Sequence, residues 1–191
     1  MGRPRTFDDD VVLARAMETF WTNGYASTSP AQLAEATGVA KGSLYNAFAS
    51  KRELFTRVLD FYHQQITELA KDLLERPGTT CECIGASLRF VVDSDLAQPR
   101  RRGCLIGNTA VELAGHDADI AQRIRKMQDE SIGWFTARIE RGQRDGDVAR
   151  DLDPRAYAEY LANTLAGLRV MAMTHDAPVL YRIIDTALAT L

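Results

Sequence analysis

Apolar residues recur every three or four positions along almost the whole of this 191-residue chain, and no run alternates apolar with polar residues. This spacing is typical of amphipathic helices, whereas strands buried on one face alternate with a period of two. The sequence therefore predicts an all-α fold of about nine helices. Its hydrophobic content of 46% is enough for a sizeable core, in one large domain or two small ones.

Residues that cap helices mark where these helices are expected to begin and end. Ser29 followed by Pro30 is a strong start, because serine accepts hydrogen bonds from free backbone N–H groups and proline fits the first turn. Thr79 with Glu82 fits a capping box, and Gly24 is a stop signal. Starts are expected after Asp8 or Asp9, at Pro30, Lys41, after Ser50, after Thr79, at Cys104, after Asp117, at Pro154 and after Asp176. The seventh helix is expected to run to about Gly142.

Residues 29–48 form the pattern that most narrowly predicts a function. Two short helices flank a glycine-containing turn at 37–40, which is the layout of a helix-turn-helix whose second helix enters the major groove of DNA. The outward positions of that helix suit phosphate and base-edge contacts: Lys41, Ser43, Tyr45 and Asn46. The alternative is a helix pair used only for packing. The pattern predicts a DNA-binding domain at 1–50, followed by a ligand-binding and dimerisation domain at 51–191.

Residues 10–55 resemble the DNA-binding domain of the tetracycline-repressor family of transcriptional regulators. The match includes Phe20, Gly24, Tyr25, Thr28, Ser29, Leu33, Ala34, Gly38, Val39, Lys41, Gly42, Ser43, Leu44, Tyr45, Phe48, Ser50, Lys51 and Leu54. The resemblance implies that Tyr45 and Lys51 contact phosphates and that Thr28 touches the DNA backbone. The full set of candidate DNA-contacting residues is Thr28, Lys41, Gly42, Ser43, Tyr45, Asn46 and Lys51. Ala49 stands where the family often has proline.

The first residues offer a further candidate DNA contact. Gly2-Arg3-Pro4-Arg5 fits an arm for the minor groove, where arginine is favoured, and fits a solvated tail equally well.

Residues 102–113 resemble a subgroup of the same family that includes the N-ethylmaleimide-responsive repressor, in which a cysteine senses reactive compounds. Cys104 is accordingly the candidate inducer-sensing residue. It stands at an expected helix N-terminus directly after Arg100, Arg101 and Arg102, and both the helix dipole and nearby cations favour the thiolate. The alternative is a buried cysteine that acts as a small hydrophobic residue.

Other features of the C-terminal half bear on ligand binding and assembly. Met127, Trp134, Phe135 and Tyr160 are candidates for lining a ligand pocket, although ordinary core packing explains each of them as well. The last two helices carry broad apolar stripes with small residues between, so they need a partner. In the resembled family these helices form the homodimer interface. A two-fold dimer would hold its recognition helices about 34–36 Å apart, or a multiple of that, on a palindromic operator.

Composition narrows the class of protein. The net charge of −3 makes DNA binding depend on local groups of basic residues rather than on overall charge. There is no secretory signal and no apolar stretch of about 20 residues, so a cytoplasmic protein with no membrane partner is expected. Cys81 and Cys83 have no histidine or cysteine at metal-ligand spacing, and no metal or cofactor is expected.

These features together predict a DNA-binding transcriptional regulator rather than an enzyme. It would be a repressor that a small-molecule or electrophile inducer releases from a palindromic operator. A cysteine-dependent enzyme and a helical protein-interaction module are the rival classes. The first lacks a recognisable Cys-His motif, phosphate loop or carboxylate pair. The second leaves the outward side chains of residues 41–46 unexplained.

Overall fold

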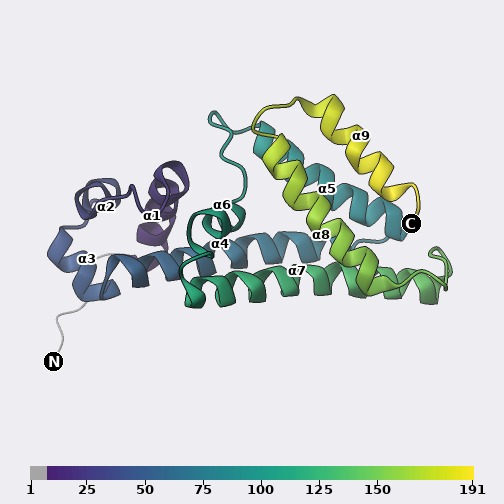
Figure 1. The fold of residues 1–191 in the computed structure, drawn as a ribbon, viewed down its shortest axis with the longest axis horizontal. Coiled ribbons are helices and arrows are strands. Elements are labelled where there is room, and N and C mark those ends of the chain that lie inside the picture. The colour runs from purple at the N-terminus through teal and green to yellow at the C-terminus, as the bar shows by residue number, and fades with distance from the viewer. Residues whose placement is uncertain (1–7) are drawn as a thin grey trace.

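The computed structural model describes residues 8–191, and within that range every regular element is an α-helix (Figure 1). This confirms the predicted all-α class, with nine helices in the described part of the chain. They are α1 (Asp9–Asn23), α2 (Pro30–Thr37), α3 (Lys41–Phe48), α4 (Lys51–Leu74), α5 (Thr80–Leu96), α6 (Leu105–Leu113), α7 (Ala118–Asp145), α8 (Pro154–Met171) and α9 (Ala177–Leu188). The arm at residues 2–5 lies outside the described residues.

Most of the predicted capping residues accept the hydrogen bonds expected of them. Ser29 and Gln32 form a reciprocal capping box at the start of α2, and Thr79 and Glu82 form another at the start of α5. The side chain of Ser50 accepts from the backbone N–H of Glu53. The seventh helix was expected to end at about Gly142. It continues to Asp145, because the residue that turns the chain in the left-handed conformation is the next glycine along, at position 146.

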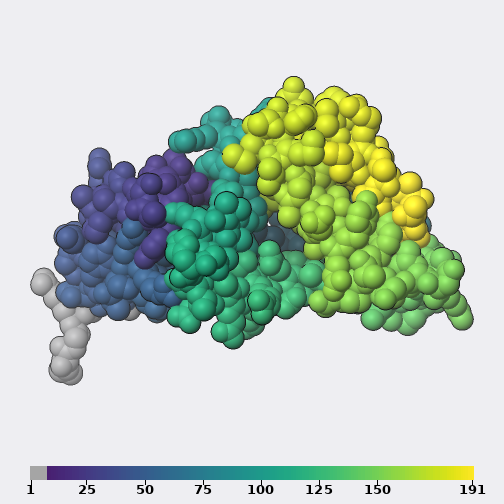
Figure 2. Space-filling view, in the orientation of Figure 1, coloured from purple at the N-terminus to yellow at the C-terminus, as the bar shows by residue number. Residues whose placement is uncertain are grey.

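Two long helices, α4 and α7, lie side by side along the molecule and connect its two ends (Figure 1). The helices α1, α2 and α3 lie at one end, and α5, α8 and α9 lie at the other. Figure 2 shows the same division in space-filling form, with the purple and blue helices at one end and the yellow helix at the other. Among residues 8–191, no helix is both long enough and apolar enough to cross a membrane.

Two apolar cores stabilise this arrangement. The first joins α1–α3 to the first half of α4, to α6 and to the start of α7, and its fully buried members include Phe20, Leu44 and Phe55. The second joins α5, α8 and α9 to the far part of α7, around Leu88 and Leu161. The first half of α4 therefore packs with the helix-turn-helix. The division of the chain at residues 50 and 51 stays a prediction.

The turn between α3 and α4 has an unusual backbone conformation at Ala49. Its φ is 61° and its ψ is −49°, and the backbone N–H of Ser50 donates to the carbonyl of Phe48 at 2.7 Å. This is a γ-turn with positive φ at its centre, which is rare and strained for any residue with a Cβ. Proline cannot adopt it, because its ring holds φ near −65°. The backbone at position 49, as it stands in this chain, is therefore incompatible with the proline that the resembled family often has here.

We expect Ala49→Gly to raise the free energy of unfolding by about 1 kcal/mol. Glycine adopts positive φ without the steric cost that alanine bears, although its greater freedom in the unfolded chain removes part of the gain. Urea denaturation at fixed protein concentration measures the change. Ala49→Pro is the matched control and should lower the same free energy. If Ala49→Gly is no more stable than the wild type, the turn is not strained.

Candidate DNA-binding face and sensing region

Helix α3 presents one polar face to solvent and one apolar face to the core. The exposed residues of this helix include Lys41, Gly42, Ser43 and Asn46. Its buried residues are Leu44 and, one turn further along, Phe48. A Cβ placed on Gly42 would have no atom within 4 Å, so the backbone there is open to close approach by a ligand. Four of the residues expected to face DNA thus lie together on one accessible surface.

Tyr45 of α3 is related to Lys51 through the ring of Tyr25. Its side chain is half-buried, and its hydroxyl is buried without a hydrogen-bond partner among residues 8–191. Burial, and next the proximity of Tyr25, raise the pKa of the Tyr45 hydroxyl. The ammonium of Lys51 lies 4.4 Å from the centre of the Tyr25 ring. A neutral hydroxyl donor and an ammonium are both groups that bind phosphate oxygens.

Thr28 is a correction to the predicted DNA contacts. Its side chain was expected to touch the DNA backbone, but the residue is only 1% exposed. Its hydroxyl donates to the carbonyl of Gly24 at 2.6 Å, and its backbone N–H donates to the carbonyl of Tyr25 at 3.3 Å. Both donors are therefore used inside the protein, where they shape the turn between α1 and α2.

The turn before the helix-turn-helix is held by a residue from the C-terminal half. The carboxylate of Glu112, near the end of α6, accepts from the backbone N–H groups of Tyr25 and Ala26 at 2.9 and 2.7 Å. At the other end of α6, the indole N–H of Trp21 donates to the carbonyl of Gly103 at 3.1 Å. Both ends of this short helix are thus joined to the DNA-binding end of the molecule.

Ion pairs also join the DNA-binding end of the molecule to the C-terminal half. Arg102 pairs with Glu18 of α1 at 2.5 Å. Arg52, at the start of α4, pairs with Asp117 before α7 and with Asp119 at 3.1 Å. Hydrogen bonding to Arg52 is the main cause that lowers the pKa of Asp117 to about 2. Sequence reasoning missed these contacts, because they join residues 65 to 87 positions apart and no local pattern marks them.

Cys104 is half-buried and forms the N-cap of α6, one residue before the helix begins. Its Sγ lies 3.9 Å from the hydroxyl oxygen of Tyr62, which accepts from Arg169 at 2.8 Å. Arg169 also donates to the carbonyl of Gly103 at 3.3 Å and forms a buried ion pair with Asp95 at 2.7 Å. The thiol therefore borders a buried polar cluster that links α4, α5 and α8.

The three preceding arginines were expected to supply the positive charge beside Cys104, but two of them form ion pairs with carboxylates elsewhere. Arg102 pairs with Glu18 and lies over the Trp21 ring, at 4.3 Å from its centre. Arg101 pairs with Asp176 at 3.1 Å. The guanidinium that belongs to the cluster around the thiol is that of Arg169, 65 positions further along the chain. Consecutive residues of a loop point in different directions, so adjacency in sequence did not predict adjacency in space.

The four candidate pocket residues do not surround one cavity. Met127 is buried in the first core and Phe135 in the second. Trp134 stacks on His63, with ring centres 5.9 Å apart, and Tyr160 is 47% exposed on α8. Met127 and Phe135 are core residues, as the alternative interpretation of the sequence had it, whereas Tyr160 is a surface residue.

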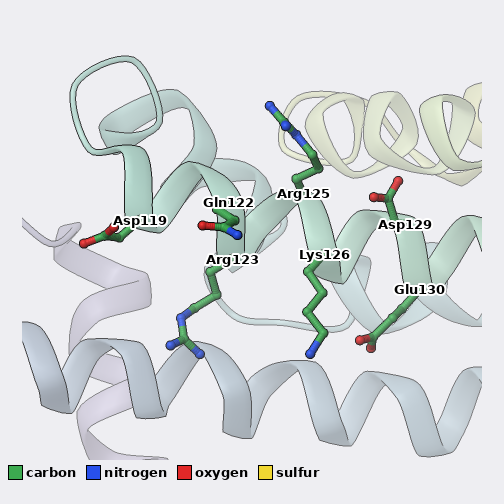
Figure 3. A pocket seen from close by; sticks show the side chains of 7 residues that line it. All are labelled: Asp119, Gln122, Arg123, Arg125, Lys126, Asp129 and Glu130. Carbon is green, nitrogen blue, oxygen red and sulfur yellow. The ribbon is translucent and has the colours of Figure 1, made fainter.

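Two hollows in the described structure differ in character. One, of about 860 Å³, runs along α7, and all its lining residues belong to that helix. Figure 3 shows Arg123 and Lys126 pointing toward α4 while Arg125 points away, and Arg123 pairs with Asp60 of α4. This is an open, charged surface. The other, of about 280 Å³, lies between α4 and α5 and is mostly apolar.

Both halves of the chain match models of one protein family. Residues 12–58 match the model described as bacterial regulatory proteins, tetR family, and residues 84–188 match the Tetracyclin repressor-like C-terminal domain. The chain is 31% identical to the uncharacterized HTH-type transcriptional regulator YezE of Bacillus subtilis (strain 168), over 100% of both proteins. It is 30% identical to the HTH-type transcriptional repressor ComR of Escherichia coli (strain K12), over 90% of this chain and 82% of ComR.

A solved structure extends the likeness to a complex with DNA. A cysteine mutant of the TetR family transcriptional regulator CifR, complexed with 26bp double-strand operator DNA, superposes on this chain with a TM-score of 0.88. The two chains are 34% identical, and the match covers 98% of each.

Proposed function

Since the chain belongs to the tetracycline-repressor family of bacterial transcriptional regulators, we propose that two copies of it bind a palindromic operator as a repressor and that an inducer releases them. Residues 1–50 carry the DNA-binding function in this proposal, and residues 51–191 bind the inducer and form the dimer. Its relatives are transcriptional regulators and not enzymes, and we propose the same of this chain.

The exposed face of α3 is the observation that carries the DNA-binding assignment. We assign base-edge contacts to the exposed residues Lys41, Ser43 and Asn46, and close backbone approach to Gly42. Tyr45 and Lys51 are assigned to phosphates, because the Tyr45 hydroxyl has no hydrogen-bond partner within residues 8–191 and Lys51 supplies an ammonium beside the neighbouring Tyr25. The complex of CifR with operator DNA supports the proposal that this fold binds DNA.

We expect Lys51→Ala to weaken operator binding about tenfold or more, because a charge-assisted hydrogen bond to a phosphate is lost from each subunit. The plot of log affinity against log salt concentration should become less steep, by about 0.9 for each lost contact. Fluorescence anisotropy with operator and with scrambled DNA measures both effects. Lys71→Ala, at an exposed position near the other end of α4, is the matched control and should leave binding unchanged. An altered sequence preference with an unchanged salt slope would contradict the phosphate assignment.

We propose further that Cys104 is the group through which electrophiles release the protein from DNA. The thiolate would add to the double bond of a compound such as N-ethylmaleimide, forming a thioether while a proton is taken up at the neighbouring carbon. The added bulk would press on the start of α6, whose other end holds the turn before α2 through Glu112. A shift of α6 would therefore displace the recognition helix.

Cys104→Ser should abolish operator release by N-ethylmaleimide while leaving operator affinity within about twofold of wild type. Cys81→Ser and Cys83→Ser serve as matched controls and should still be released. Anisotropy of labelled operator, with the reaction followed by intact mass, gives both the extent of release and the number of modified thiols. Equal release of the wild type and Cys104→Ser would remove Cys104 from the mechanism.

A further inference from the structure

The cavity of about 280 Å³ between α4 and α5 has the build of a small-molecule site. Its walls come from the facing sides of the two helices, with Leu69 and Leu73 on α4 and Phe90 and Val91 on α5. Its volume is near the lower end of the range of about 300–1,000 Å³ that is typical of ligand sites. Leu69 and Phe90 are partly exposed, at 37% and 39%, which is consistent with a mouth between the helices.

The charges that line this cavity cancel. Arg169 and Asp95 are the charged lining residues, their side chains are 10% and 4% exposed, and they form a bidentate ion pair with each other. Burial raises the pKa of the neighbouring Tyr62 hydroxyl, so it too is uncharged. A charged ligand would have to lie in an apolar cavity without a counterion or break the existing pair, and both are costly. A neutral occupant meets neither cost.

Ser87 supplies a hydrogen-bonding group that the protein itself does not use. It lines the cavity and is only 4% exposed, yet its side chain makes no hydrogen bond with any residue in the range 8–191. A hydroxyl that makes no hydrogen bond within the protein can donate to a ligand and accept from it. Ser87 lies two turns before Asp95 on α5, roughly 12 Å along the helix axis. The cavity thus offers polar groups at Ser87 and near Asp95 beside a mostly apolar wall, and its other polar lining residues include Gln65, Ser94 and Gln98.

Part of the wall belongs to α1, at the DNA-binding end of the molecule. Met17 and Trp21 line the cavity, and the Trp21 ring packs edge-on against Tyr62, with 5.1 Å between ring centres. The indole N–H of Trp21 shares the carbonyl of Gly103 with Arg169. A molecule in the cavity would therefore touch α1 directly as well as the ion pair behind it. Cys104 is not a lining residue, so this site is distinct from the reactive thiol.

We propose that this cavity binds a small neutral molecule with an apolar body and a hydrogen-bonding group, and that the bound molecule changes operator affinity by contact with Met17 and Trp21. Of these two claims, only the change in operator affinity rests on the proposed function. A ligand that binds more tightly when α1 is in one position than in another raises the population of protein molecules with α1 in that position. Release by a noncovalent ligand and release by modification of Cys104 would then both act through the contacts between the DNA-binding end and the C-terminal half of the molecule.

Three probes with one apolar body and different end groups test the ligand class: benzyl alcohol, benzoate and benzylammonium. The chain contains two tryptophans, and only Trp21 lines the cavity. Full-length protein labelled with 5-fluorotryptophan should give two fluorine NMR signals, assigned with Trp21→Phe. We expect benzyl alcohol to shift the Trp21 signal and leave that of Trp134 in place. The two charged probes should bind at least tenfold more weakly.

Two variants test the location. Ala70→Leu fills the cavity from α4 and should weaken benzyl alcohol binding at least tenfold, whereas Ala137→Leu, at an exposed position on α7, should leave it unchanged. Ser87→Ala, which adds no bulk, should weaken binding severalfold. Equal binding to all these variants, a shift confined to Trp134, or preference for a charged probe would overturn the proposed site.

Operator affinity measured with and without saturating benzyl alcohol tests the mode of action. A fall in affinity that Ala70→Leu abolishes supports it, and an unchanged affinity overturns it. Failure of the proposed function is distinguishable, because it would appear as a lack of operator binding by the protein without any probe. The fluorine NMR result does not depend on DNA.

Discussion

Asp95→Ala should lower the free energy of unfolding by about 3–5 kcal/mol, the loss typical of removing one partner from a buried ion pair. Asp95 is 3% exposed, and both of its oxygens accept from Arg169 at 2.7 and 2.8 Å. Without the carboxylate, the guanidinium would remain buried with only the Tyr62 hydroxyl and the Gly103 carbonyl as partners. Guanidinium chloride denaturation at one fixed protein concentration measures the loss, because dimerisation makes stability depend on concentration.

Controls separate the ion pair from a general effect of losing a carboxylate. Asp72→Ala, at an exposed position on α4, should change stability by less than about 0.5 kcal/mol. The double variant Asp95→Leu with Arg169→Leu should recover much of the loss, because apolar residues can replace a buried pair at little cost. A loss below 1 kcal/mol for Asp95→Ala would mean that water reaches the guanidinium.

Val170→Glu should convert the dimer to a monomer at micromolar concentration and weaken binding to the palindromic operator at least about 100-fold. Val170 is 66% exposed on α8, and two other large apolar residues of this region are exposed as well, Tyr160 on the same helix at 47% and Met173 just after its end at 44%. We assign Val170 and this exposed apolar surface to the dimer interface, where a carboxylate would be buried without a partner. Two linked modules bind about 10²–10⁴ times more tightly than one, and a monomer loses that gain.

Sedimentation velocity and operator titration measure the two consequences on the same samples. Val111→Glu is the matched control, because Val111 is a 91% exposed valine on α6 and not on α8. It should stay dimeric and bind the operator. A charge at Ile184 would be a poor test, since that residue is fully buried within its own protomer and the variant would unfold. If Val170→Glu is still a dimer, the interface lies on another face.

The fold was predictable because its signals are local. Ser29, Ser50 and Thr79 each cap a helix within three residues of themselves, and the structure has the hydrogen bonds that this requires. The outward face of α3 was predictable for the same reason, since helical periodicity alone separates Leu44 from its exposed neighbours.

The rest of the site depends on contacts that no local pattern encodes. Thr28 was misassigned because its hydroxyl donates to the carbonyl of Gly24, four residues back. The sequence does not show whether this hydroxyl donates to that carbonyl or to the DNA backbone. The cation in the cluster around Cys104 comes from α8, and the cavity is formed by α4 and α5 with α1 and α8 at its edge. These groups meet only through the packing of helices that are distant in the chain.

The attachment of α6 at both ends has a consequence for building hybrid repressors. A hybrid that joins residues 1–50 to the ligand-binding half of another family member would keep the recognition helix. It would lose the Glu112 carboxylate that holds the backbone of Tyr25 and Ala26, and the Gly103 carbonyl that receives the Trp21 indole. The unit to transplant is therefore discontinuous in sequence and consists of α1–α3 together with residues 102–113. A hybrid that receives only α1–α3 would acquire a new DNA specificity, but its DNA-binding end would no longer be connected to the inducer-binding half.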